Sequence, residues 1–255
     1  MKILVIPDIH GRIFWKTPCQ QIDKYDKIVF LGDYVDPYKH EHISEKDAIE
    51  NFKQILDFAE QNKDKVILLL GNHDLHYTSM TFNFICGGCR KSVLHSIKIS
   101  SLFNAHQDLF NIAFETESTL FTHAGYMFEW GKKYGVLPKA AQLNMLNTAK
   151  NIKVLTDVSY ARGGNNLVGS CVWSDVTEKV SIDKDTHELI NITGCDKYQI
   201  FGHTLQVKLS ENGQSYEFDN IKDLYKNKFW AMLDNGHVWE YDDENMSLYQ
   251  LENGL

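Results

Sequence analysis

Arginines, prolines and long apolar runs are scarce in this sequence. Of its 255 residues only three are arginines and four are prolines, and the formal net charge is -8. General nucleic-acid binders and membrane-surface binders cluster Lys and Arg to meet phosphate groups, so this charge balance argues against both classes. No stretch approaches the roughly 20 apolar residues of a membrane span. A small phosphorylated substrate agrees with these limits.

The five cysteines do not suggest a disulfide framework, because their number is odd and no secretory signal precedes them. The apolar run over residues 3–6 is too short for the core of a signal peptide and predicts a strand. Cys86 and Cys89 fit a redox pair or half of a zinc site, yet no second Cys-x-x-Cys or histidine pair completes one, and we interpret them as structural thiols. We therefore expect reduced, buried thiols and a cytoplasmic protein.

Short apolar runs, each followed by polar or metal-binding residues, recur five times along the chain. Runs of this length, rich in branched residues and bounded by glycine or proline, are typical of strands in a sheet that is covered on both faces. No internal repeat with a period of roughly 20 to 50 residues is evident. The runs cover residues 3–6, 28–31, 66–70, 120–121 and 198–201.

Helix signals separate the first three runs. Thr17-Pro18 is a helix-start pair, in which Thr17 would cap the helix and the proline would lose no hydrogen bond. Ser44, with Asp47 three residues later, resembles a capping box. The opening order is therefore strand, helix, strand, helix, strand. The second helix is expected to run to about Asn62, with an apolar face of Ala48, Phe52, Ile55, Leu56 and Ala59.

The pattern changes after residue 228. Asn235-Gly236 separates apolar stretches at 229–234 and 237–241, which is a strong hairpin signal. We expect a second, antiparallel-rich sheet here, so that two sheets pack together with helices outside. One domain over residues 1–255 is expected, in which helix and loop segments at about 75–118 and 126–197 wall the functional site.

The residues directly after the five predicted strands carry the chemistry. In open α/β sheets ligands bind beyond the carboxyl ends of the strands, so these positions are able to converge. Carboxylate, imidazole and amide oxygen without thiolate suit Mn²⁺, Fe or Zn²⁺, and two such ions can share one bridging carboxylate. The sets are Asp8-Ile9-His10, Gly32-Asp33-Tyr34-Val35-Asp36, Gly71-Asn72-His73-Asp74, His123-Ala124-Gly125 and Gly202-His203-Thr204.

From Asp8 to His203 the chain resembles the calcineurin-like metallophosphoesterase superfamily, whose D-x-H, G-D-x-x-D, G-N-H-[D/E], H and G-H blocks occur here in order. It looks nearest to the phosphoprotein (serine/threonine) phosphatase branch, because of the GDYVD and GNHD blocks, the Trp173-Ser174-Asp175 triplet and the lack of a second histidine after Gly202-His203. The resemblance implies an α/β fold, a four-layer α-β-β-α sandwich of two mixed sheets flanked by helices. It also implies a metal-dependent phosphoesterase whose substrate is a phosphoprotein or a small phosphoester.

The resemblance further implies a role for each matching residue. His73 would be the general acid, and Asp36 would hold its imidazole in the useful tautomer. A hydroxide that bridges two metal ions would attack a phosphomonoester in line, without a covalent intermediate. Mn²⁺ is the favoured metal, with Fe and Zn²⁺ as alternatives. The implied ligands are Asp8 and His10 for the first ion, Asn72, His123 and His203 for the second, and Asp33 bridging both.

One position departs from the protein-phosphatase pattern. That branch has Arg-Gly directly after the second aspartate of G-D-x-x-D, and Pro37-Tyr38 stands here instead. The phosphate clamp must then come from elsewhere, because a planar guanidinium holds two phosphoryl oxygens in a way that lysine cannot. Arg162, ahead of the Trp173 triplet, is the first candidate. Arg12, directly after the first metal block, is the second, and Arg90 is the third.

Two other functions stay open. A nucleotide hydrolase, cleaving dinucleoside polyphosphates or phosphodiesters, would use the same metals. A non-catalytic binding module would keep the fold alone. Asp36 and His73, which bind no metal in the family's pattern, are both present and favour catalysis. The sequence does not indicate an oligomeric state.

Overall fold

The computed structural model describes residues 1–78, 93–148, 150–183, 189–204 and 225–252. The segment with Cys86, Cys89 and Arg90 lies outside the described residues, so the interpretation of those thiols stays a prediction. Within the described ranges no helix is long and apolar enough to cross a membrane. The remaining cysteines are buried, as expected of thiols that pack as small apolar groups, and burial raises the pKa of each; they are Cys19, Cys171 and Cys195.

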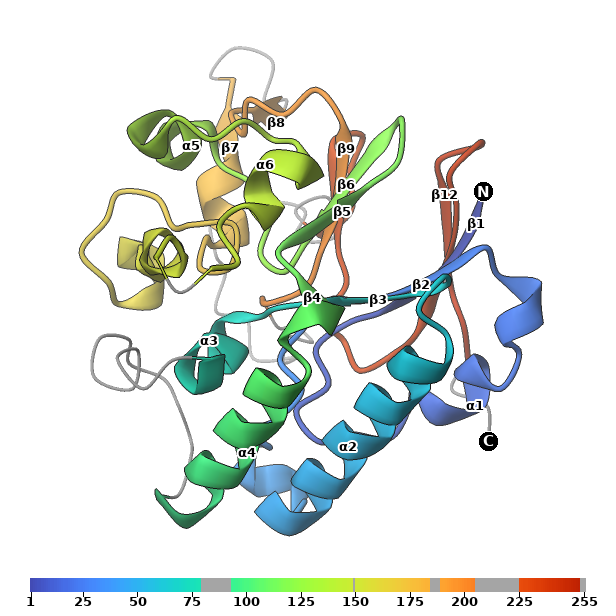
Figure 1. Cartoon of the computed structure of the whole chain (residues 1–255). Coiled ribbons are helices and arrows are strands. Elements are labelled where there is room, and N and C mark those ends of the chain that lie inside the picture. The colour runs from blue at the N-terminus through green and yellow to red at the C-terminus, as the bar shows by residue number, and fades with distance from the viewer. Residues whose placement is uncertain (79–92, 149, 184–188, 205–224, 253–255) are drawn as a thin grey trace.

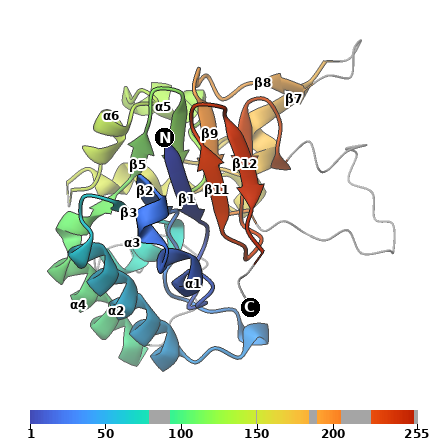
Figure 2. The ribbon, with the colours of Figure 1, turned by 90° about the vertical axis from the view of Figure 1, so that its right-hand side faces the viewer.

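Two mixed sheets pack face to face, with helices on their outer sides (Figures 1 and 2). The strand order of the larger sheet is β12 (Ser247–Gln250), β11 (Trp239–Asp242), β1 (Lys2–Ile6), β2 (Lys27–Phe30), β3 (Val66–Leu69) and β4 (Phe110–Asn111). The strand order of the smaller sheet is β10 (Trp230–Met232), β9 (Tyr198–Phe201), β6 (Thr119–Thr122) and β5 (Ala113–Glu115). In the larger sheet β1 to β4 are parallel, while β11 and β12 are antiparallel additions beside β1. Among the described strands of the smaller sheet, only β5 is antiparallel to its neighbour. The predicted sandwich is confirmed.

Successive side chains of β1 alternate between two hydrophobic clusters, one on each face of the larger sheet. Ile3 and Val5 pack with Phe121 in the cluster between the two sheets, whereas Leu4 and Ile6 belong to the cluster on the helical side. Successive side chains of a strand point to opposite faces, and both faces are covered here, so every position favours an apolar residue. The continuous apolar runs of the sequence follow from this double cover.

Helix α2 (Glu45–Gln61) covers the larger sheet together with α4 (Val93–Ala105) (Figure 1). Ser44 is the N-cap of α2, because its Oγ accepts the backbone N–H of Asp47 at 3.1 Å, so the predicted cap is confirmed. All five residues predicted for the apolar face of α2 are buried.

The predicted cap at Thr17 is wrong. Helix α1 (Lys16–Cys19) begins after Trp15 without a side-chain cap, and Thr17 lies inside it. The buried Trp15 indole donates to Asn51 Oδ1 of α2 at 3.1 Å and so anchors the chain ahead of Thr17. A tertiary contact, rather than capping chemistry, determines where this helix starts.

Shorter elements surround the remaining strands. Helix α3 (Asn72–Thr78) directly follows β3, and a separate two-stranded sheet consists of β7 (Val180–Ile182) and β8 (Leu189–Asn191). The other helices are α5 (Phe128–Tyr134) and α6 (Ala140–Asn144), with 3-10 helices at Ile22–Lys24, Lys39–Glu41, Gln107–Leu109, Ile152–Thr156, Tyr160–Arg162 and Val176–Lys179.

The predicted hairpin at Asn235-Gly236 is also wrong. Gly236 takes φ +74°, as a tight turn requires, but the turn joins strands of different sheets. Strand β10 lies parallel to β9, whereas β11 pairs with β1 and forms the hairpin with β12 instead. The edge of β1 presents unpaired backbone groups, and β11 satisfies them. The smaller sheet is therefore mostly parallel rather than antiparallel-rich.

Phe52 joins α2 to the core, and its removal tests this packing. Its buried ring stacks on Tyr34 with centroids 5.3 Å apart and lies 4.7 Å from the ring of Phe103. Phe52→Ala should lower the free energy of unfolding by about 3 to 5 kcal/mol, because lost contacts leave a cavity. Gln54→Ala, on the exposed face of α2, should change it by less than about 0.5 kcal/mol. Urea denaturation measures both, and similar small losses in the two variants would contradict this account of the core.

Candidate metal centre

The loops that carry the predicted ligands meet at the junction of the two sheets. His123, after β6, donates from Nδ1 to the carbonyl oxygen of Leu31, after β2, at 2.8 Å. The backbone N–H of His203, after β9, lies 3.0 Å from Asp8 Oδ1, after β1. Each of these hydrogen bonds joins the carboxyl end of a strand in one sheet to that of a strand in the other.

The backbone of the site is bent into the left-handed region at four residues. Non-glycine residues with positive φ cost of the order of 1 to 3 kcal/mol each and gather at functional sites. These residues lie in the loops that follow β1, β2 and β9, where they turn the chain sharply beside the strand ends. The residues are His10 (φ +44°), Asp33 (φ +57°), Asp36 (φ +62°) and His203 (φ +68°).

Asp33 lies between two groups of potential ligands. Its Oδ2 is 3.5 Å from His10 Nε2 and 3.6 Å from His123 Nε2. His123 Nε2 is also 4.0 Å from Asp8 Oδ1. The atoms of His10, Asp33 and His73 form one possible ligand triplet, and those of Asp8, Asp33 and His123 form another. Asp33 belongs to both triplets.

A second cluster of potential ligand atoms adjoins the first. Asn72 Oδ1 lies 2.9 Å from His123 Nε2 and 2.8 Å from His203 Nδ1, and the two imidazole nitrogens are 3.2 Å apart. The structure therefore brings together all six predicted ligands, which come from five different strand ends.

This donor set fits divalent cations. It consists of carboxylate, amide and imidazole atoms without thiolate, the mixture that Mn²⁺, Fe or Zn²⁺ accept. His10 and His123 each give their Nδ1 to a backbone carbonyl, of Val35 at 3.1 Å and of Leu31 at 2.8 Å. Such bonds leave Nε2 with its lone pair toward the cluster, which is how metal-binding histidines are oriented.

Burial and neighbouring charges shift the pKa values of the site's residues in different directions. Burial raises the pKa of Asp8, with His123 opposing the effect. Burial alone would also raise the pKa of Asp33, but the imidazoles of His123, His73 and His10 outweigh it and lower that pKa. Burial, followed by the Arg162 charge, holds the pKa of His203 well below its usual value. A neutral imidazole is the form that binds a metal.

His73 and Asp36 form a buried pair beside this cluster. His73 Nδ1 lies 2.9 Å from Asp36 Oδ2, and the backbone N–H of His73 donates to Asp33 Oδ1 at 2.9 Å. An Nδ1–H donated to a carboxylate leaves Nε2 as the other functional atom of the ring. The geometry thus agrees with the pairing that the sequence resemblance implied.

Asp74 supports the site, and the sequence interpretation gave it no role. Its fully buried carboxylate accepts backbone N–H groups from Gly71 at 2.8 Å, Asp33 at 2.7 Å and Tyr34 at 3.0 Å. Asp74 therefore fastens the loop after β2 to the loop after β3. The only sequence signal was its place as the last residue of Gly-Asn-His-Asp.

Two glycines allow the carboxylates to approach the backbone. A Cβ on Gly71 would lie 2.1 Å from Asp33 Oδ1, and one on Gly202 would lie 2.0 Å from Asp8 Oδ2. Neither distance is tolerable between non-bonded atoms, so a larger residue would displace the carboxylate. Glycine beside each ligand is thus a packing requirement.

The two described candidate arginines both contact loops of the site. Arg162 has its Nε 2.8 Å from Asp175 Oδ2, and its Nη2 donates to Thr204 Oγ1, next to His203. Arg12 donates from Nη1 to the carbonyl oxygen of Asp8 at 3.3 Å. Its Nε donates to Glu41 at 2.7 Å, and its guanidinium lies 5.5 Å from the ring centre of Tyr38, the second residue of the pair that stands in place of Arg-Gly.

The Trp173-Ser174-Asp175 triplet supports the loop after His123. Ser174 Oγ lies 2.8 Å from the carbonyl oxygen of Ala124 and 2.9 Å from that of Gly125. Lys179 is fully buried and donates to Ser174 Oγ at 2.6 Å, with its Nζ 4.9 Å from the ring centre of Phe201. The sequence did not single out Lys179, because nothing local marks a lysine as buried.

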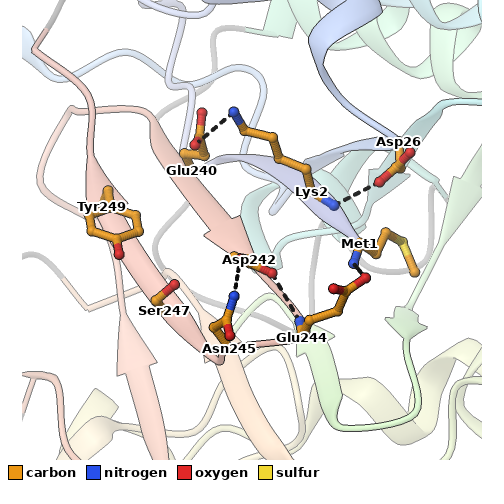
Figure 3. Close-up of a pocket in the computed structure, with 9 residues that line it drawn as sticks. All are labelled: Met1, Lys2, Asp26, Glu240, Asp242, Glu244, Asn245, Ser247 and Tyr249. Atoms are coloured by element: carbon orange, nitrogen blue, oxygen red, sulfur yellow. Dashed lines mark hydrogen bonds and ion pairs between the residues drawn. The ribbon is translucent and has the colours of Figure 1, made fainter.

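A hollow of about 560 Å³ lies at the end of the larger sheet that is remote from the candidate metal centre (Figure 3). Its lining includes Lys2, which pairs with Glu240 at 3.0 Å, and the N-terminal amine, which pairs with Glu244 at 3.1 Å. Lys2 and Asp242 face each other in neighbouring strands, at the end of β1 remote from Asp8. The surplus of carboxylates repels a phosphoryl group, so we assign the hollow no part in the chemistry.

The chain belongs to the calcineurin-like phosphoesterase family, whose model matches residues 1–207, and it is a metallophosphoesterase. No curated protein matches the sequence. A cold-active protein-tyrosine phosphatase of a psychrophile, Shewanella sp., has a similar structure with TM-score 0.52 and 15% identity, covering 98% of this chain and 80% of that chain. A phosphoesterase from E. coli gives TM-score 0.35 and 12% identity, with 100% of both chains covered. Identities this low concern the fold alone.

Burial of Lys179 makes the stability of the protein depend on pH. Burial lowers the pKa of Lys179 from 10.5 to about 7. The unfolded chain therefore binds this proton more tightly than the folded one. Stability should rise between about pH 7 and 9, by up to about 3 kcal/mol, because above pH 9 the raised pKa values of the buried thiols act in the opposite direction. In Lys179→Met this rise should disappear, whereas the exposed Lys153→Met should keep it. Urea denaturation at several pH values measures the difference, and equal slopes for both variants would refute it.

Proposed function

We propose that this protein is a dinuclear metal phosphomonoesterase, and one observation carries the proposal: Asp33 faces two groups of ligand atoms at once. Its Oδ2 lies within 3.6 Å of both His10 Nε2 and His123 Nε2. A carboxylate in that position suits two cations better than one. The proposed ligands are Asp8 and His10 for one ion, Asn72, His123 and His203 for the other, and Asp33 for both. Mn²⁺ is the metal that we expect to support activity.

Two bound ions would supply Lewis-acid chemistry, polarising the phosphoryl oxygens and activating a water molecule. The protein itself would supply a proton and would bind the phosphoryl group. His73, oriented by Asp36, would protonate the leaving oxygen from Nε2. Arg162 and Arg12 would bind the remaining phosphoryl oxygens. Both guanidiniums contact loops that carry proposed ligands, which supports this placement.

A phosphoserine or phosphothreonine residue in a protein is the proposed substrate, after the phosphatase branch that the motifs resemble. The similar Shewanella protein is named a protein-tyrosine phosphatase, so phosphotyrosine is a related candidate. A nucleotide hydrolase is the second candidate, because a dinuclear site can also cleave phosphodiesters and phosphoanhydrides. We also propose one domain over residues 1–255, with the segments 75–118 and 126–197 walling the site.

A substrate panel with added Mn²⁺ tests the proposal. It comprises p-nitrophenyl phosphate, bis-p-nitrophenyl phosphate, phosphoserine, phosphothreonine and phosphotyrosine peptides, and diadenosine tetraphosphate. Monoesterase function predicts the highest kcat/KM for a peptide or for p-nitrophenyl phosphate. A preference for diadenosine tetraphosphate or the diester would favour the nucleotide hydrolase. Metal binding without turnover of any substrate would favour a binding module.

Replacing Asp33 should remove both metals. Asp33→Asn keeps the shape of the side chain but loses the charge that two cations would share, so metal content measured by mass spectrometry should fall from about two per chain toward zero, together with activity. Asp57→Asn, an exposed change on α2, should retain both. Two tightly bound ions and full turnover in Asp33→Asn would contradict the bridging role.

Arg162 should affect substrate binding without affecting metal binding. Arg162→Lys loses the planar pair of donors, so KM should rise and kcat/KM should fall roughly 10-fold or more, on the ~1.5 to 3 kcal/mol of a hydrogen bond to a charged group. Arg12→Lys provides the matched comparison, because Arg12 is the second candidate. Unchanged kinetics in both Arg162→Lys and Arg162→Ala would remove Arg162 from the phosphate site.

A further inference from the structure

Tyr77 follows His73 by four residues on α3 and contacts the same carboxylate. Residues four apart on a helix share one face, so both side chains point toward Asp36. Asp36 Oδ2 lies 2.9 Å from His73 Nδ1, and Asp36 Oδ1 accepts the hydroxyl of Tyr77. Both oxygens of Asp36 are thus engaged by side chains of a single helix.

The Tyr77 hydroxyl is held in place by packing. Tyr77 is fully buried, and its ring lies parallel to that of Phe103 on α4, with centroids 6.2 Å apart and an angle of 4° between the planes. Asp36 is also buried, at 4% exposure, so water competes little for its oxygens. The hydrogen bond from Tyr77 is therefore made by a donor with little freedom to move.

The hydrogen bond from Tyr77 matters because the carboxylate of an aspartate rotates easily about its χ2 torsion. The χ2 angle of aspartate is broad, so one hydrogen bond to His73 would leave the plane of the carboxylate loosely defined. The orientation of an imidazole in turn depends on the partner of its Nδ1. A carboxylate held at both oxygens therefore holds the imidazole ring of His73 in one orientation.

We propose that Tyr77 is a positioning residue for the hydrolysis, which holds Asp36 so that His73 keeps Nε2 directed at the leaving oxygen. This inference rests on the proposed function, because it requires His73 to act as a general acid. A general acid helps most when the leaving group is a poor one. Loss of its orientation should therefore be visible in the dependence of rate on the leaving group.

The test is Tyr77→Phe, which removes the hydroxyl and keeps the ring against Phe103. With Mn²⁺ present, kcat for phenyl phosphate should fall about 10-fold, while kcat for p-nitrophenyl phosphate, whose leaving group needs no proton, should fall less than about 2-fold. KM and metal content should stay as in the unmodified protein. A purely structural role for Tyr77 would lower both rates alike.

The matched control is Tyr241→Phe. Tyr241 is also fully buried, shares a hydrogen bond with Thr119 Oγ1 at 2.6 Å and stacks on Tyr198, but it lies on β11 in the cluster between the sheets. Its replacement should lower thermal stability without any dependence on the leaving group. A leaving-group effect in Tyr241→Phe equal to that in Tyr77→Phe would overturn the inference.

His73→Asn distinguishes failure of the inference from failure of the proposed function. This variant should lower kcat for phenyl phosphate far more than kcat for p-nitrophenyl phosphate. Adding Tyr77→Phe to it should lower kcat no further, because Tyr77 acts through His73. If His73→Asn shows this dependence and Tyr77→Phe does not, only the role of Tyr77 is wrong. If His73→Asn shows none, the general-acid assignment fails and the role of Tyr77 fails with it. A further 10-fold loss in the double variant would also overturn the inference.

Discussion

The buried carboxylates of Asp8 and Asp33 lie where the two sheets meet, and burial of such charge is unfavourable unless donors and positive charge face it. The structure supplies the donors from the backbone. The N–H of His203 lies 3.0 Å from Asp8, and the N–H of His73 lies 2.9 Å from Asp33. The left-handed residues and the close glycines bring backbone groups up to these two charges, and the three hydrogen bonds to Asp74 hold the loops after β2 and β3 in place. The paired sheets hold this arrangement together.

Much of the site could be predicted because it depends on local properties of the chain. A run such as residues 28–31 ends at Gly32-Asp33 wherever the strand lies in the sheet, and parallel strands share the edge where their carboxyl ends meet. The convergence of Asp8, Asp33 and Asn72 follows from these two facts. His123 and His203 follow strands of the other sheet, and their arrival at the same point depends on how the sheets pack.

The errors arise where a distant partner decides the structure. Asn235-Gly236 has good turn chemistry, but the open edge of β1 decides where β11 pairs. Thr17 is a suitable cap, yet the Trp15 contact with Asn51 starts the helix earlier. Lys179, Asp74 and Tyr77 were not assigned for the same reason, since their importance lies in contacts with residues that the sequence does not place beside them.

The order of the chain also governs how the site is assembled. The hydrogen bond between the His203 backbone and the Asp8 carboxylate spans 195 residues. Synthesis proceeds from the N-terminus, and contacts this distant in sequence form slowly. A nascent chain therefore carries Asp8, Asp33 and Asn72 on an incomplete sheet long before His203 exists. The Asp8 carboxylate therefore gains this backbone donor only after the chain has been made as far as His203.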